Sequence, residues 1–418
     1  ITGLYWQDSD LSLGAKSNFN VNPADSDSLG PIAIGSLIAE GIAGAQLAAL
    51  GGDASDPAAV LGMAAAMAGS IGAYTRAATL DQNSETLALF LQTSWDLSET
   101  TRLTLGGRYG EEDKTAAQGV HCAAWDTFAI DDSTCTPLQL VLGEFQPHQN
   151  DDLTRSEGQW TYNANVQWDI RNDTMVYANV STGVKSGGFN SFALTAAPSE
   201  AEFEEEEVLS FELGAKMALL DGRAELNVAV FNMKYEDLQA TIFTGATGFK
   251  VENAASASIS GVEVDGRWQL SEQLMLSASA GYVDFEFDEY KNAGCTNEQK
   301  AAMGFAGLFT KPPVGTMVGN AIAVDFDGNG LTDACEQDLS GGTNAFTPEF
   351  SASLSLEHEM DIANHYFLRT SLDMNYMGDH HTAQDNDTLV YQDAYTLVNA
   401  TLTFGGHDER WDVSLIAR

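Results

Sequence analysis

The chain has 418 residues, of which 44% are hydrophobic, and a formal net charge of −41 from 19 basic and 60 acidic side chains. An ordinary hydrophobic fraction argues against a bundle of transmembrane helices. So strong a negative charge argues against nucleic acid, and against an anionic membrane surface, as an electrostatic partner. It suits a protein surrounded by salt or divalent cations, and it leaves the fold to be inferred from residue order.

Apolar and polar residues alternate most clearly along 159–169. A strand has a side-chain period of two, so this segment has one apolar and one polar face. A strand that crosses a bilayer needs about 9–11 tilted residues, which fits this length. The apolar face would carry Trp160, Tyr162, Ala164, Val166 and Trp168.

The same alternation recurs along the chain and predicts a transmembrane antiparallel β-barrel, in an all-β fold, to which this sequence contributes about thirteen strands. The predicted strands are 1–13, 84–97, 101–114, 156–169, 174–186, 207–220, 223–243, 248–270, 273–287, 347–360, 365–378, 391–405 and 411–418.

The connections between these strands alternate between short turns and long loops, as in an outer-membrane barrel with periplasmic turns and extracellular loops. The short turns are 98–101, 170–173, 220–223, 271–272, 361–364 and 406–410. The long loops are 14–83, 115–155, 187–206, 288–346 and 379–390. The remaining connection, 244–247, is short, but its long flanking strands predict a hairpin that projects beyond the membrane. Six of the seven tryptophans lie in predicted strands, several near strand ends, where interfacial aromatic residues gather.

The four cysteines form two local pairs, Cys122 with Cys135 and Cys295 with Cys335, each within one polar loop. This arrangement predicts two disulfides formed in an oxidising compartment. Closing a loop of about fifteen residues would stabilise it by ~3 kcal/mol in the chain-entropy model. Four free thiols are the alternative, and a zinc site is disfavoured because no CxxC spacing occurs.

One acidic segment of the loop 288–346 fits the twelve-residue calcium-binding pattern from Asp325 to Glu336. Gly330 would allow the sharp turn, and the last carboxylate would close the site with two oxygens. We interpret this as a structural calcium site of weak, extracellular type; an acidic, glycine-rich surface turn is the alternative. The candidate ligands are Asp325, Asp327, Asn329, Leu331 (through its carbonyl), Asp333 and Glu336.

Two segments of the loop 14–83, namely 31–50 and 57–79, are rich in Ala, Gly and Leu with helical spacing. Length alone would allow the second to cross a membrane, but its composition favours a helical hairpin over the barrel mouth. The acidic run around Glu204 is interpreted as a solvated loop edge or a divalent contact with lipopolysaccharide. His380 and His381 are expected to be an exposed pair that takes no part in binding.

Several stretches, in order, resemble those of TonB-dependent outer-membrane receptors. The segment Val180–Asn190 contains VKSGGFN, which is similar to that family's GYKSGGFN, and LSFELGAK in 207–216 is similar to its SYELGLK. Further resemblances lie at 105–109 (LGGRY), 220–223 (LDGR), 231–238 (FNMKYEDL), 259–263 (ISGVE) and 395–400 (YTLVNA).

This resemblance implies a 22-stranded plugged barrel, with 1–418 as its incomplete barrel domain. The plug with its TonB box, about eight front strands and the final strand are expected to lie outside this sequence. The implied function is import of a scarce ligand, most often a ferric siderophore, with energy from the TonB complex. The implied location is the bacterial outer membrane, where the barrel contacts lipid and lipopolysaccharide.

No group of residues with catalytic spacing is evident in the sequence. The alternatives are a passive substrate-specific porin and a calcium-ordered surface-binding barrel. Residues expected to line the lumen or contact the plug are Asn163, Asn165, Gln167, Glu212, Lys216, Glu263 and Arg267.

Overall fold

The computed structural model describes most of the chain, apart from several connecting segments. The described residues are 1–20, 59, 61, 73–123, 129–135, 147–193, 201–243, 249–304, 312–324, 332, 334–363, 365–408 and 410–418.

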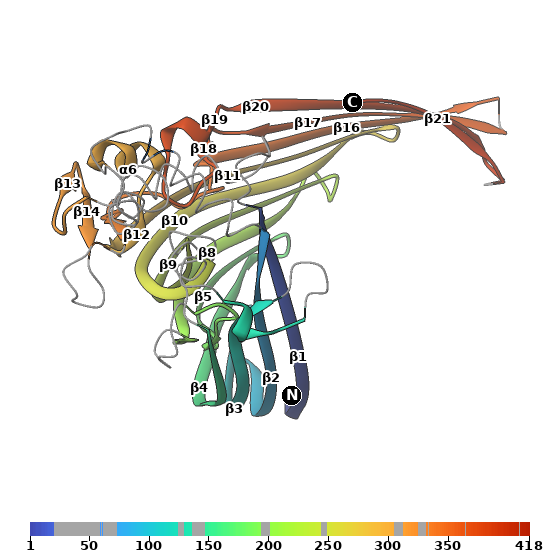
Figure 1. Cartoon of the computed structure of the whole chain (residues 1–418). Coiled ribbons are helices and arrows are strands. Elements are labelled where there is room, and N and C mark those ends of the chain that lie inside the picture. The colour runs from blue at the N-terminus through green and yellow to red at the C-terminus, as the bar shows by residue number, and fades with distance from the viewer. Residues whose placement is uncertain are drawn as a thin grey trace.

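The framework of the molecule is one curved, antiparallel, open sheet of thirteen strands, with β1 at one edge and β21 at the other (Figure 1). Each strand pairs with the framework strand that follows it in the sequence, which confirms the predicted all-β class. The strands are β1 (Thr2–Asn20), β2 (Ala73–Asp96), β3 (Thr101–Ala123), β4 (His148–Arg171), β5 (Thr174–Lys185), β8 (Glu206–Leu219), β9 (Ala224–Phe243), β10 (Phe249–Ser271), β11 (Leu274–Tyr290), β16 (Phe350–Ile362), β17 (Tyr366–Met377), β20 (Tyr395–Gly406) and β21 (Asp412–Ala417).

The register of the ladders gives the sheet one apolar and one polar face. Side chains directly opposite each other lie on the same face, so Trp160 of β4 joins Tyr109 of β3, and Gln159 joins Gly110. On the apolar face Trp160 is 65% exposed and Leu213 is 58% exposed. A continuous exposed apolar surface of this kind is what a strand presents to lipid.

Aromatic side chains on the apolar face gather at two levels. Near the short turns, Tyr366, Phe404 and Trp411 contact one another, with ring centroids 5.5–6.0 Å apart. Toward the loops, Tyr109 and Trp160 lie 4.8 Å apart. Trp160 and Trp168 lie on the same face of β4, and eight residues of a tilted strand correspond to about 20 Å along the membrane normal. The two levels therefore match the interfaces of a bilayer.

The first four strands extend further toward the loops than the alternation predicted. Residues 14–20 and 73–83, expected in the first long loop, pair with each other in β1 and β2, and 115–123 and 148–155 lengthen β3 and β4. The second expected helix, 57–79, therefore ends in β2 from Ala73 onward; the rest of the expected helical hairpin lies almost wholly outside the described residues. Where the side chains of these extensions are described, at 76–83, 115–123 and 148–155, the large apolar ones are buried, because beyond the bilayer a strand has no lipid to contact.

Smaller elements lie in the loops above the sheet. Among the described residues, no helix is long and apolar enough to cross a membrane. A four-stranded sheet in the order β12-β15-β14-β13 accompanies α6 between β11 and β16. The loop elements are β6 (Gly188–Phe189), β7 (Glu202–Phe203), β12 (Ala293–Gly294), α6 (Asn297–Met303), β13 (Met317–Val318), β14 (Ala321–Val324), β15 (Ala334–Gln337), β18 (His380–His381), β19 (Tyr391–Gln392), and the short 3-10 helices η1 (Asp132–Thr134) and η2 (Thr388–Val390).

Candidate functional site on the polar face and in the loops

The polar face carries a series of hydrogen bonds between neighbouring strands. Asn163 donates to Asn179 at 2.7 Å, and the Arg267 guanidinium bonds the Glu225 carboxylate at 2.8 Å. The register places Glu263, opposite Ala229 and Gly281, on this same face. The residues expected to line the lumen therefore share one surface. Further pairs on it join Asn227 to Asp265, Ser279 to Ser353, Ser355 to Asp373 and Arg369 to Glu359.

The stretch Lys185–Asn190 is the point at which the loop after β5 folds back over the polar face. The Gly187 amide donates to the Glu157 carboxylate at 3.2 Å, and its carbonyl accepts from Lys114 Nζ at 2.6 Å. A Cβ at Gly187 would meet the Phe203 carbonyl oxygen and would lie 2.6 Å from Arg155 Nε. The glycine is required here because two chains and a guanidinium occupy the space of a side chain.

The residues that follow this turn pack the loop against the sheet. Phe189 is buried in one cluster with apolar side chains of β2, β3 and β4. Asn190 exchanges two hydrogen bonds with the Val251 backbone of β10, at 2.7 and 3.0 Å. The motif thus joins strands β2 to β4 with β10 across the intervening strands. The apolar side chains packed with Phe189 are Leu80, Ala116, Leu153, Ala193 and Ala201.

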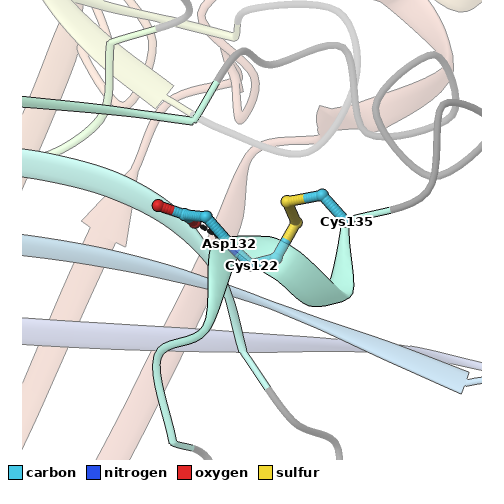
Figure 2. A group of neighbouring side chains, drawn as sticks. All are labelled: Cys122, Asp132 and Cys135. Atoms are coloured by element: carbon cyan, nitrogen blue, oxygen red, sulfur yellow. Dashed lines mark hydrogen bonds between the residues drawn. A yellow bond between two sulfur atoms is a disulfide. The ribbon is translucent and has the colours of Figure 1, made fainter.

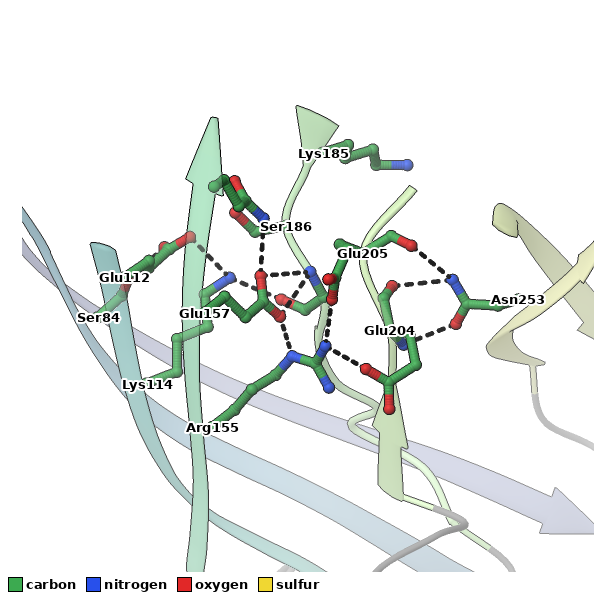
Figure 3. Close-up of polar contacts among 12 residues, drawn as sticks. Ser84, Glu112, Lys114, Arg155, Glu157, Lys185, Ser186, Glu204, Glu205 and Asn253 are labelled. Atoms are coloured by element: carbon green, nitrogen blue, oxygen red, sulfur yellow. Dashed lines mark hydrogen bonds and ion pairs between the residues drawn. The ribbon is translucent and has the colours of Figure 1, made fainter. Parts of the chain in front are cut away.

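Arg155 of β4 is the central cation of this docking site (Figure 3). Its side chain is only 9% exposed and forms ion pairs with Glu157 of its own strand and with Glu204 and Glu205 of the loop, the last at 2.7 Å. The hydrogen bond from Arg155 holds the pKa of the Glu204 carboxyl below its ordinary value. The acidic run interpreted as a solvated edge or a lipopolysaccharide contact is solvated at Glu204, whose side chain is 68% exposed, and in addition Glu204 and Glu205 pair with Arg155 of β4. The sequence could not reveal this, because Arg155 lies about fifty residues away.

Asn253 of β10 completes the docking of the acidic segment. Its side-chain oxygen accepts from the Glu204 amide at 2.6 Å, and its amide group donates to the carbonyls of Glu204 and Asp237 at 2.9 and 2.8 Å. Gln239 of β9 donates to the Ser186 carbonyl at 3.0 Å. Both ends of the loop are thus held by side chains of the sheet.

The two cysteine pairs singled out in the sequence are joined in the structure. Cys122, at the end of β3, bonds to Cys135 just after η1, and Cys295 bonds to Cys335 of β15. Asp132 fixes the first of these loops by accepting from the Cys122 amide at 3.0 Å (Figure 2). Cys122, Asp132 and Cys135 lie close enough for metal binding, but sulfurs in a disulfide are not the thiolates that a metal requires.

The calcium-type segment lies mostly outside the described residues, including Asp325, Asp327, Asn329, Leu331 and Asp333. Thr332 and the last three residues, 334–336, are described. Cys335 is tied to Cys295 by the disulfide, and Glu336 stands in β15 opposite Gly294 of β12. The segment therefore ends on a cross-linked sheet, with a half-buried carboxylate at its twelfth position.

The loop sheet also contacts the loop between β17 and β20. The buried Gln337 side chain of β15 donates to the carbonyls of Gly294 and Asp385, at 2.7 and 2.8 Å. Burial lowers the pKa of the Lys300 ammonium of α6 and raises the pKa of the Asp385 carboxyl, while each charge opposes the shift of the other. The two outer loops therefore form one packed unit.

The expected exposed histidine pair is not exposed. His380 is buried and donates from Nδ1 to the Gly378 carbonyl at 2.9 Å. His381 packs edge-on against Tyr391, with ring centroids 4.9 Å apart. Pairing of β18 with β19 turns both rings into the loop unit, which a local dipeptide pattern cannot predict.

An antiparallel sheet with a lipid-type face, a polar face, short turns at one end and long loops at the other defines an outer-membrane barrel wall. The family described as "TonB dependent receptor-like, beta-barrel" matches residues 5–417. The chain therefore belongs to the β-barrel family of TonB-dependent receptors, which are outer-membrane transporters and not enzymes.

Individual relatives agree with this assignment. The metal-pseudopaline receptor CntO of Pseudomonas aeruginosa strain PAO1 is 26% identical over 215 residues, covering 51% of this chain and 26% of that receptor. The CntO protein of strain UCBPP-PA14 is 31% identical over 117 residues, covering 28% of this chain and 15% of its own length. The chain thus matches only about a quarter, or less, of the length of these curated relatives.

Solved structures support the fold. The ferric yersiniabactin uptake receptor FyuA from Yersinia pestis superposes with a TM-score of 0.56 and 17% identity, over 82% of this chain and 44% of that one. The siderophore receptor PiuA from Acinetobacter baumannii superposes with a TM-score of 0.52 and 15% identity, over 82% of this chain and 40% of that one. At these identities the likeness concerns the arrangement of strands alone.

Proposed function

We propose that the protein to which this chain belongs imports a metal chelate, namely a ferric siderophore, across the outer membrane with energy from the TonB complex. The main support is the family match along nearly the whole chain. The relatives point in the same direction, because CntO is named as a metal-pseudopaline receptor and FyuA as a ferric yersiniabactin uptake receptor. The partners of this proposal are the TonB complex, acting on a plug, and a small metal-bearing ligand.

The polar face suits this role. It presents amides, carboxylates and guanidinium groups that would line the lumen or contact a plug, while the docked loop after β5 narrows the space above them. A passive porin with the same wall would conduct ions and would not depend on TonB.

Growth on a panel of single ferric chelates tests the proposal, with a deletion of the full-length gene compared with its complemented strain. Loss of growth on one chelate, rescued by the gene and dependent on TonB, is the expected result. Unchanged growth on every iron source would overturn iron import and favour another ligand. TonB-independent uptake would favour the porin alternative.

We propose further that 325–336 binds calcium as a structural ion, with Asp325, Asp327, Asn329, Asp333 and Glu336 as side-chain ligands and Leu331 as a carbonyl ligand. The support is the complete spacing of the motif and the cross-linked strand on which it ends.

Calcium should raise the thermal midpoint of the full-length protein above the midpoint measured in the presence of a calcium chelator. The double variant Asp325→Asn/Asp327→Asn should lose that rise, while the control Asp151→Asn/Asp152→Asn should keep it. An equal calcium response in both would contradict the site.

A further inference from the structure

A recess on the polar face contains a guanidinium that has no partner among the residues the structure describes. The recess has a volume of about 460 Å³. It is lined by residues of β1 to β5 and by Ser186 after β5. Those that present polar groups or rings are Tyr5, Gln7, Thr86, Phe90, Arg108, Glu111, Glu112, Gln159 and Ser186.

Three other arginines of the polar face pair with carboxylates. Arg155 pairs with three carboxylates, Arg267 with Glu225, and Arg369 with Glu359. In a chain with 60 acidic and 19 basic side chains, such pairing is the expected state of a cation. The half-buried Arg108 departs from that state, since no described residue accepts a hydrogen bond or ion pair from it.

Both carboxylates that line the recess already have partners. Glu111 accepts from the Tyr109 hydroxyl at 2.9 Å. Glu112 accepts from the Ser84 hydroxyl at 2.6 Å and pairs with Lys114 at 3.3 Å. Gly110 lies between Arg108 and these carboxylates in β3, and a Cβ there would stand 3.1 Å from the Arg108 guanidinium nitrogens. The missing side chain gives the guanidinium room to lie along the strand, with its donors directed into the recess.

The depth of the recess in the membrane follows from the residues next to Arg108 and Gln159 in the sequence. Tyr109 and Trp160, which follow Arg108 and Gln159, belong to the aromatic level nearer the loops. Arg108 therefore lies at the height of the outer interface, on the side from which a ligand enters, and beneath the docked loop that contains Ser186.

We infer that Arg108 is an anion-recognition residue of this recess, and that the imported ligand carries net negative charge from carboxylate or catecholate groups. This inference rests on the proposed function. A guanidinium offers paired donors that match such groups bidentately, and Tyr5 and Phe90 supply apolar walls for the rest of the ligand. Because the net charge of −41 on this chain repels anions, local recognition of this kind is needed to hold one.

The test measures binding to the purified full-length receptor by quenching of its intrinsic fluorescence. The probes are iron(III) complexes of citrate, of a tris-catecholate and of an uncharged tris-hydroxamate. We compare the wild type with Arg108→Gln and Arg108→Lys. Arg410→Gln is the matched control, because it removes an exposed guanidinium from the turn before β21, outside the polar face. The expected result is that Arg108→Gln weakens binding of an anionic complex by about tenfold or more. The affinity of Arg108→Lys should lie between those of the wild type and Arg108→Gln, and Arg410→Gln should bind as the wild type does.

The other outcomes overturn the inference in distinguishable ways. Unchanged affinity of Arg108→Gln for an anionic complex would remove the residue from recognition. Binding of only the uncharged complex would refute the anionic class and leave metal-chelate import standing. An equal loss for every complex, with a lower thermal midpoint, would mean that Arg108 holds another part of the receptor. Failure of the wild type to bind any complex, with unchanged growth of the deletion strain, would refute the proposed function itself.

Discussion

At the scale of single residues, the docking of the loop after β5 depends on positions where a side chain is absent or a charge is present. Gly187 has both backbone groups engaged, by Glu157 and Lys114. Arg155 and Glu157 are almost fully buried, so neither can lose its partner and regain water without local opening. These requirements explain in physical terms why a glycine stands at position 187 and why the charges of Arg155 and Glu157 stand beside it.

Replacing Gly187 by alanine should undock this loop. The new Cβ would overlap the Phe203 carbonyl oxygen, and overpacking against backbone costs about 1–3 kcal/mol. Limited proteolysis of the full-length protein should then cut between β5 and β8 faster than in the wild type. Gly107→Ala is the matched control, because nothing lies within 4 Å of its added Cβ. Equal cleavage of both variants would contradict the docking role.

The Arg155–Glu204 ion pair should make the conformational stability of the protein depend on pH. The folded-state pKa of Glu204 lies below its ordinary value of 4.5 because Arg155 donates to the carboxylate. The stabilisation is therefore fully present above about pH 4.5 and is lost as the pH falls through the lowered pKa. The difference in urea midpoint between wild type and Glu204→Gln should be constant near neutral pH and shrink below that value. The exposed neighbour Glu207, changed to Gln, serves as the control. A difference that is independent of pH would exclude the ionised pair as its source.

At the scale of elements, alternation predicted the thirteen strands and the order of short and long connections, because a lipid-facing strand must place an apolar side chain at every second position. The alternation did not predict the parts of strands that lie outside the bilayer, where no side chain has to face lipid. The loop-side ends of β2 and β4, at 73–83 and 148–155, lie outside the bilayer and carry no such pattern. The strands of the loop sheet have two to four residues, too few for any period to be detected.

The candidate site was predictable only in part, for a similar reason. The polar face follows from alternation, and the cysteine pairs follow from their closeness in sequence. The partners of Arg155 come from a loop about fifty residues away, and the burial of His380 comes from pairing of β18 with β19. Contacts of this kind depend on the register of the sheet, which residue composition does not specify.

The disulfide between Cys295 and Cys335 should hold the loop unit together independently of the wall. It closes a span of 40 residues, for which the chain-entropy model gives about 4 kcal/mol. In the Cys295→Ser/Cys335→Ser variant, trypsin should cut after Lys300 of α6, while the framework strands remain resistant. The variant Cys122→Ser/Cys135→Ser is the control, since its bond lies in a different loop. Protection of Lys300 in both variants would show that packing alone suffices.

At the scale of the whole molecule, the two faces of the sheet should differ sharply in their tolerance of charge. Leu213 lies on the apolar face near the middle of the membrane, where an arginine costs about 2–4 kcal/mol. Ser210, three residues away on the polar face, should accept the same substitution. We expect Leu213→Arg to reduce the folded, heat-modifiable band of the full-length protein in outer membranes, and Ser210→Arg to leave it intact. Similar losses in both variants would refute the assignment of faces.

The extended ends of β1 to β4 have a consequence for encounters at the cell surface. From Trp160 to His148 the strand continues for twelve residues, or about 40 Å of chain, past the outer aromatic level. An approaching phage fibre or antibody would therefore meet paired backbone rather than a pliable loop. Epitopes there would be conformational: they would exist only while the strands stay paired, and antisera raised against short peptides from 73–83 or 148–155 would fail to stain intact cells.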